Sequence, residues 1–181
     1  TYLAYTQLPA LCAETGAQLV YQPMLLGGVF KATGNASPIS VPAKGRYMFD
    51  DLARYAKRYN VALKFNPHFP INTLVLMRAV MGIQMRQPER FQAFIDCLFR
   101  AIWVEGRHLG DPAVVAAVLS EAGFDPEEVL NLANDEKVKA ALKDKTEQAV
   151  QRGVFGAPSM FVGNDLFFGQ DRLEFVREAL R

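Results

Sequence analysis

The chain has 181 residues, half of them apolar and 22% charged, and its formal net charge is +1. This length accommodates one compact domain with a sub-domain, and the composition is typical of a soluble globular protein. Because basic and acidic residues are interspersed, no charged field favours nucleic acid or an anionic membrane surface. No run of about 18 apolar residues predicts a membrane span, and no signal peptide is evident. The chain is therefore expected to bind neither nucleic acid nor membranes.

The cysteines and histidines show no pattern typical of a redox pair or a metal site. Cys12 and Cys97 lie far apart, each inside an apolar helical pattern, and neither belongs to a Cys-x-x-Cys motif. Both are expected to be reduced, buried thiols. His68 and His108 do not have the spacing of zinc ligands. The sequence therefore predicts no metal centre.

The first 65 residues are predicted to hold two helices, two strands and a long loop. Apolar residues three and four apart predict a helix over 1–15, and alternation predicts a strand over 18–25. Residues 26–44 are rich in Gly, Pro, Ser and Asn, which favours a surface loop with at most one helical turn. A second amphipathic helix is expected over 44–60, followed by a short strand over 61–65.

The middle of the chain is predicted to be entirely helical after an extended passage over 66–70. That passage contains two prolines, and each restricts the residue before it to an extended conformation. Asp111 and Asp125 are each followed by proline, the pattern of an N-cap with proline in the first helical position. Helices are expected over 72–85 and 88–104, from residues 111 and 125, and over 137–152.

The stretch from Val154 to Leu173 is predicted to form a hairpin and the start of a last helix. Pro158 would precede a strand over 159–162, a position where its missing N–H removes no ladder hydrogen bond. The bond before a proline is also the one at which a cis peptide has the lowest energetic cost. Gly163-Asn164 suits a tight turn before a second strand over 166–168. Asp171 stands before an apolar-periodic run and is expected to cap it.

Three motifs carry a resemblance to a known family: Gly-Ala-Pro-Ser at 156–159, Phe-Gly-Gln-Asp-Arg-Leu at 168–173 and Thr-Tyr-Leu-Ala at 1–4. With them the chain resembles the 2-hydroxychromene-2-carboxylate isomerase and kappa-class glutathione transferase family of the DsbA-like group. The resemblance implies an α/β fold, a thioredoxin-like sheet with an inserted all-helical sub-domain. It places the thioredoxin-like domain at 1–65 and 154–181 and the insertion at 66–153. The first strand of that fold is expected to precede residue 1.

The resemblance also implies a function. The family would make this chain a cytoplasmic, homodimeric, glutathione-dependent isomerase that acts on an aromatic acid in aromatic-compound catabolism. Thr1 falls where a DsbA-like oxidoreductase has its second active-site cysteine, and a hydroxyl there cannot resolve a mixed disulfide. The family's catalytic serine would precede Thr1, so no catalytic residue is assigned. A kappa-like transferase or peroxidase and a non-catalytic thioredoxin-like binding module stay open as alternatives.

For glutathione, the resemblance implies contacts from the backbone at Ala157-Pro158, from the N–H groups of Gly169-Gln170-Asp171 and from the Asp171 carboxylate. Arg172 and Asn35 complete the implied cofactor site. Each side chain has a structural alternative: Asp171 as a helix cap, Arg172 as an exposed charge and Asn35 as a turn residue.

The implied contacts to the aromatic substrate come from Lys31, Phe69, Asn72 and Trp103. Lys31 would receive a carboxylate, and Phe69 and Trp103 would line the pocket. The alternatives are a helix cap for Asn72 and a core position for Trp103.

Overall fold

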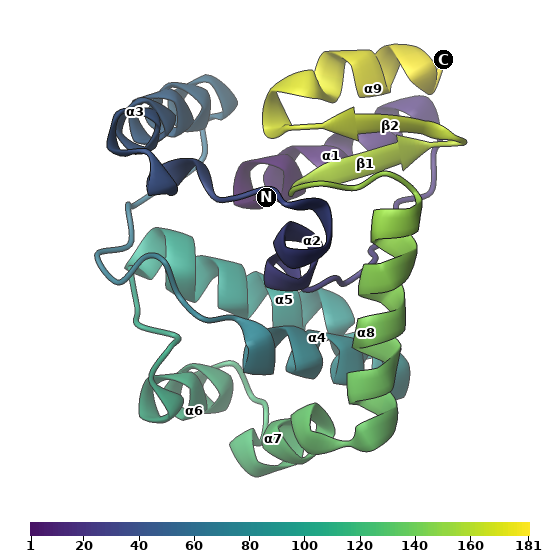
Figure 1. Ribbon diagram of the computed structural model, residues 1–181. Helices are drawn as coiled ribbons and strands as arrows, with labels where there is room; N and C mark the ends of the chain where they lie inside the picture. The colour runs from purple at the N-terminus through teal and green to yellow at the C-terminus, as the bar shows by residue number, and fades with distance from the viewer. The chain divides into compact units, whose positions relative to one another are not determined.

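The computed structural model describes residues 1–181, and the chain divides into two compact units (Figure 1). The first unit contains residues 1–22, 26–62 and 147–181, and the second contains residues 23–25 and 63–146. The first unit therefore joins both ends of the chain, and the second is formed mainly by its middle. No helix in the structure combines the length and the apolar character needed to cross a bilayer.

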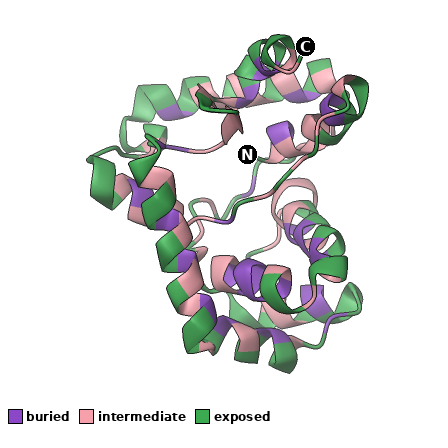
Figure 2. Cartoon of the chain, turned by 90° about the vertical axis from the view of Figure 1, so that its right-hand side faces the viewer, coloured by how far each residue is buried: buried purple, intermediate pink, exposed green.

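The chain is mostly helical, with one small sheet. Its helices are α1 (Tyr2–Thr15), α2 (Leu26–Thr33), α3 (Pro42–Tyr59), α4 (Leu74–Arg86), α5 (Phe91–Arg100), α6 (Pro112–Glu121), α7 (Pro126–Asn134), α8 (Glu136–Gln151) and α9 (Leu173–Ala179). The strands are β1 (Ser159–Val162) and β2 (Asp165–Phe168). Short 3₁₀ turns lie at Pro38–Ser40, Pro88–Arg90 and Gln170–Arg172, and a π-helical turn at Ala101–Glu105. Buried and exposed residues alternate along the helices, as expected where one face packs on a core (Figure 2).

In the first unit, the hairpin packs with α1 and α9. The strands pair antiparallel from Ser159 opposite Phe168 to Val162 opposite Asp165, so Gly163-Asn164 forms the predicted two-residue turn. Gly163 has a φ of 58°, which glycine adopts without steric cost. Leu11, Leu173 and Val176 form the buried centre. The partly buried side chains around them are those of Leu8, Tyr59, Met160, Val162, Phe167 and Leu180.

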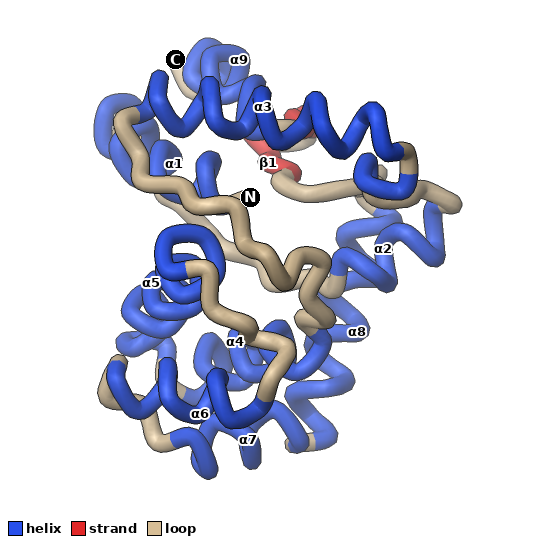
Figure 3. The backbone as a smooth tube through the Cα atoms, turned by 90° about the vertical axis from the view of Figure 1, so that its left-hand side faces the viewer, coloured by secondary structure: helices blue, strands red, loops and turns tan.

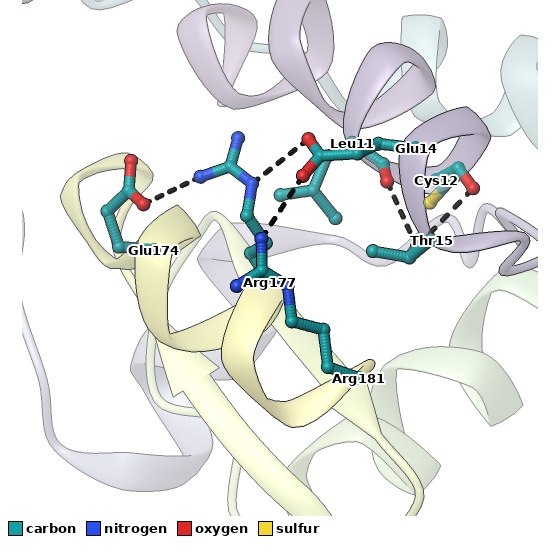
Figure 4. Close-up of polar contacts among 7 residues, drawn as sticks. All are labelled: Leu11, Cys12, Glu14, Thr15, Glu174, Arg177 and Arg181. Atoms are coloured by element: carbon teal, nitrogen blue, oxygen red, sulfur yellow. Dashed lines mark hydrogen bonds and ion pairs between the residues drawn. The ribbon is translucent and has the colours of Figure 1, made fainter.

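An ion cluster on the surface of this unit links α1 to α9 (Figure 4). Arg177 donates from Nε to Glu14 at 3.1 Å and from Nη1 to Glu174 at 2.6 Å. Arg181 reaches the second oxygen of Glu14 at 3.5 Å. The hydrogen bonds to Glu174 and Glu14 raise the pKa of the Arg177 guanidinium. The cluster therefore holds the exposed edges of the two helices together above the apolar contact, with the modest strength of surface ion pairs.

The second unit is a helical bundle with capped helix starts. Met81, Val138 and Leu142 form a buried cluster between α4 and α8, and Phe94 packs edge-on against Phe124 with ring centroids 5.0 Å apart. The predicted caps are confirmed. The Asp111 carboxylate accepts from the Ala113 N–H at 2.8 Å, and the Asp125 carboxylate accepts from the Glu127 N–H at 2.9 Å. The five predicted middle helices are all present as α4 to α8.

Gly82 sets the approach of α4 to α7, and we predict that Gly82→Ala destabilises the protein. A Cβ built on Gly82 would lie 2.9 Å from the Leu132 Cβ, an atom fixed to the α7 backbone. We expect the overpacking to lower the free energy of unfolding by about 1–3 kcal/mol, measured by urea denaturation. The control is Gly27→Ala in α2, where no atom lies within 4 Å of the new methyl group. That change should be neutral or stabilising, and equal effects at both positions would contradict the packing argument.

Three predictions for the first 65 residues are wrong. Residues 18–25 and 61–65 are not strands, and the β1–β2 hairpin is the only sheet (Figure 3). Alternating apolar residues favour an extended backbone, but a strand also needs a neighbouring strand to pair with, and neither segment pairs with one. The expected loop over 26–44 contains α2 and a 3₁₀ turn instead. Gly27-Gly28 made a helix seem unfavourable there, but α2 buries Val29 completely.

Candidate functional site

The loop before β1 presents unused backbone hydrogen-bonding groups. The Ala157–Pro158 peptide bond is cis. Ala157 is half-buried, and its N–H and carbonyl have no hydrogen-bond partner in the protein. Gly156 beside it is buried, and a Cβ there would lie 2.7 Å from Phe168 Cε2. Strand-like pairing with an extended peptide needs such a free N–H and carbonyl.

Two hydrogen bonds join this loop to the other segments predicted to bind the cofactor. The Gly169 N–H donates to the Pro158 carbonyl at 3.0 Å. The Asn35 Nδ2 donates to the Phe155 carbonyl at 2.7 Å, while its Oδ1 accepts from the Ala36 N–H. Figures 1 and 3 both place the N-terminal end of α1 beside the start of β1. Segments from three parts of the sequence therefore meet in the first unit.

The residues after β2 differ from the predicted helix start. Residues Gln170–Arg172 form a 3₁₀ turn before α9, and Asp171 caps neither element. Its carboxylate instead pairs with Arg172 Nη1 at 2.5 Å and folds back over Gly169. A side chain at Gly169 would collide with that carboxylate, and its φ of 106° also favours glycine.

Some polar groups of this turn are hydrogen-bonded within the protein, and others are free. The Gly169 N–H is occupied by Pro158, whereas the N–H groups of Gln170 and Asp171 have no acceptor. The Gln170 side chain is buried, and its Oε1 has no hydrogen-bond partner. Of this residue, the backbone N–H is therefore the group considered for ligand binding. The Gln170 carbonyl accepts from the Tyr59 hydroxyl at 3.0 Å.

A cavity of about 310 Å³ lies beside this turn, among α1, α3 and α9 of the first unit. Asp171, Tyr59 and Arg58 are among its lining residues. Burial raises the pKa of Tyr59, and nearby Tyr55 adds to the effect. Tyr59 lies in the helix that the sequence predicts over 44–60, and no local pattern indicates its hydrogen bond to Gln170, which is 111 residues away.

Among the predicted substrate residues, Phe69 and Trp103 lie together in the second unit, with ring centroids 5.7 Å apart. Asn72 precedes Thr73, the N-cap of α4, and its Oδ1 accepts from the Leu74 N–H at 3.0 Å. Lys31 is exposed in the last turn of α2, which belongs to the first unit. Thr1 precedes α1 without a side-chain cap, and its carbonyl accepts from the Tyr5 N–H at 2.9 Å.

The protein's own thiols are not activated nucleophiles. Cys12 is buried in α1, and burial raises the pKa of its thiol. Burial also raises the pKa of Cys97, in α5, to about 11. Because the thiolate is the reactive form, neither group is poised to attack at neutral pH.

We predict that iodoacetamide at neutral pH leaves both cysteines unmodified in the folded protein and leaves its activity unchanged once the reagent is removed. Mass spectrometry would count the alkylated thiols. The same protein unfolded in guanidinium chloride is the control and should gain two alkyl groups. Rapid modification of a cysteine in the folded state, with loss of activity, would show that a protein thiol takes part in the reaction.

Residues 1–181 match the family described as the DSBA-like thioredoxin domain. The chain belongs to this DSBA-like family. It has the DSBA-like thioredoxin fold, mostly helical with a small two-stranded sheet. The resemblance predicted from the three motifs is confirmed.

Two groups of enzymes are among the relatives of this DSBA-like chain. It is 30% identical to the 2-hydroxychromene-2-carboxylate isomerase of Sphingobium xenophagum, over 99% of this chain and 91% of the relative. It is 28% identical to glutathione S-transferase kappa 1 of Rattus norvegicus, over 90% of this chain and 77% of the relative. A solved structure of a 2-hydroxychromene-2-carboxylate isomerase is similar, with a TM-score of 0.82 at 26% identity over 99% and 87% of the two chains.

Proposed function

We propose that this protein is a glutathione-dependent isomerase that acts on an aromatic acid of the 2-hydroxychromene-2-carboxylate type. The observation that supports the proposal most is the set of unpaired polar groups gathered in the first unit. These are the N–H and carbonyl of Ala157 and the N–H groups of Gln170 and Asp171. They lie on two segments joined by the hydrogen bond from Gly169 to Pro158. Relatives that are isomerases of this type support the choice of reaction.

The available groups fit the polar parts of glutathione. The Ala157 N–H and carbonyl would pair with the backbone of the cysteinyl unit, as an added strand does. The N–H groups of Gln170 and Asp171 would donate to the γ-glutamyl carboxylate. The Asp171 carboxylate, whose side chain is 36% exposed, would accept from the γ-glutamyl ammonium in competition with Arg172. The second N–H of the Asn35 amide would donate to the tripeptide backbone.

Bound glutathione would supply a thiol that adds reversibly to a conjugated double bond, so that the bond can rotate. The residues of this chain then have the task of orientation. In the second unit, Phe69 and Trp103 would contact the aromatic ring of the substrate, and Asn72 would supply a polar contact. Holding reacting groups in a fixed geometry contributes strongly to such reactions.

A kappa-like glutathione transferase is the second candidate, and the similarity to rat and human kappa transferases supports it. Product analysis separates the two candidates. The protein would be incubated with 2-hydroxychromene-2-carboxylate and glutathione, and the products would be separated by liquid chromatography. An isomer of unchanged mass supports the proposal, and a stable thioether supports the transferase.

S-Methylglutathione is the matched control ligand, because it keeps the tripeptide but lacks a free thiol. Isomerisation with glutathione and none with S-methylglutathione is the expected result. Isomerisation without any thiol would overturn glutathione dependence. If neither tripeptide changes the thermal midpoint of unfolding at millimolar concentration, the non-catalytic binding module is favoured.

A further inference from the structure

Asn66 is a fully buried polar residue in the segment that leads to α4, with a relative exposure of 0%. Its Nδ2 donates to the Ile102 carbonyl at 3.0 Å and to the Arg107 carbonyl at 2.9 Å. Its Oδ1 accepts from the His68 N–H at 2.8 Å. One amide side chain therefore satisfies one carbonyl in the π-helical turn Ala101–Glu105, one carbonyl two residues after that turn, and one N–H of its own segment.

The bonds of Asn66 connect two irregular segments of the second unit. One is the π-helical turn Ala101–Glu105, which carries Trp103. The other is the passage of residues 63–70, which carries Phe65 and Phe69. One further bond strengthens the connection, because the Lys64 N–H donates to the Trp103 carbonyl at 2.7 Å. Within the passage itself, the Phe69 N–H donates to the Asn66 carbonyl at 3.1 Å. π-Helical turns are found frequently at functional sites of proteins.

Phe65, Phe69 and Trp103 form an aromatic trio on these two segments. Phe65 packs edge-on against Phe69 with centroids 6.0 Å apart, and Phe69 lies 5.7 Å from Trp103. Phe65 is 45% exposed, and Phe69 and Trp103 are partly exposed. The trio therefore presents aromatic surface that a planar ring can contact by stacking or edge-to-face packing.

We propose that Asn66 is a positioning residue that fixes the aromatic trio for binding a planar aromatic acid. The ligand class rests on the proposed function, whereas the positioning role rests on the hydrogen bonds. Only an amide of this length offers two donors to the carbonyls and an acceptor to the His68 N–H. A carboxylate at the same place would keep the acceptor and set negative charge against both carbonyls, so the π-helical turn would move away from the passage.

The first test is spectroscopic and needs no ligand. Trp103 is the only tryptophan, so its fluorescence reports on the trio directly. In folded Asn66→Asp, we expect the Trp103 emission to shift to longer wavelength and its quenching by acrylamide to increase. The control is Thr146→Val, which removes the buried hydrogen bonds from Leu25 and to Leu142 in the same unit. It should lower stability without moving the Trp103 emission.

An unchanged Trp103 spectrum in folded Asn66→Asp would overturn the positioning role. If that variant fails to fold, Asn66→Ser is measured at low temperature, because serine can still accept from the His68 N–H. The serine variant should show the same red shift, and a wild-type spectrum for it would equally overturn the inference.

The second test measures binding of 2-hydroxycinnamate, a planar aromatic acid, by quenching of Trp103 at saturating glutathione. We expect Asn66→Asp to raise the Kd for this acid by about tenfold or more, because small displacements of a positioned group have large effects. The Kd for glutathione should stay unchanged. Equal affinities of wild type and variant for the acid would overturn the inference alone. If the wild type does not bind the acid, both the ligand class inferred for the trio and the substrate class of the proposed function are wrong. The positioning role of Asn66 is then decided by the spectroscopic test.

Discussion

Replacing Asp171 with asparagine should raise the KM for glutathione by between about tenfold and 100-fold, because the proposed hydrogen bond to the γ-glutamyl ammonium would no longer be charge-assisted. The Asp171 carboxylate is the acidic group beside the unpaired N–H groups of Gln170 and Asp171. The backbone groups remain in the variant, so kcat at saturating glutathione should change little. Initial rates measured over a range of glutathione concentrations would separate the two constants.

The control for this change is Asp165→Asn, which removes the same charge at an exposed position of the hairpin. Its KM for glutathione should stay within about a factor of two of the wild-type value. A KM that changes equally in both variants would indicate a general charge effect. An unchanged KM in Asp171→Asn would remove Asp171 from the cofactor site.

Gly156→Ala should lower kcat/KM by about 100-fold while the protein stays folded, because either the Phe168 ring or the loop that carries Ala157 must move. The new methyl group would lie 2.7 Å from Phe168 Cε2 and 3.1 Å from its Cζ. The Phe168 ring packs against Phe155 with centroids 4.5 Å apart, and the Phe155 carbonyl accepts from Asn35. Displacing the ring therefore disturbs the segments that the two linking hydrogen bonds hold together. Steady-state kinetics and urea denaturation would measure the two effects.

A second substitution tests whether the loss is steric. Phe168→Leu shortens a ring that is 41% exposed, so the change alone should be mild. Combined with Gly156→Ala, it makes room for the methyl group and should restore a large part of kcat/KM. If the double variant instead loses kcat/KM by the product of the two single-variant factors, the clash with Phe168 is not the cause.

The parts of the site that could be predicted from the sequence depend on local chemistry. Pro158, the Gly163-Asn164 turn and the Asp-Pro helix starts each specify a backbone conformation within a few residues, and the structure has all of them. The motif around Asp171 located the polar turn correctly. Its predicted capping role was wrong, because the neighbouring Arg172 pairs with the carboxylate.

The parts that could not be predicted depend on partners distant in the sequence. Residues 18–25 and 61–65 have strand-like patterns, but the pattern does not supply a neighbouring strand. Asn66 stands in an Asn-Pro passage that resembles an ordinary loop. Its side chain bonds to carbonyls 36 and 41 residues away, which no local pattern indicates.

The sequence by itself determined the family, the helical middle, the closing hairpin and the position of the two segments that the proposed glutathione site uses. These follow from short-range turn, cap and motif chemistry. Only the tertiary structure decided which of those groups are free. It pairs Gly169 with Pro158, leaves Ala157 unpaired and makes Asn66 a link between the two segments that carry the aromatic trio. The physical reason is that neighbours in space determine whether a hydrogen-bonding group is paired or free. The order of residues along the chain does not specify those neighbours.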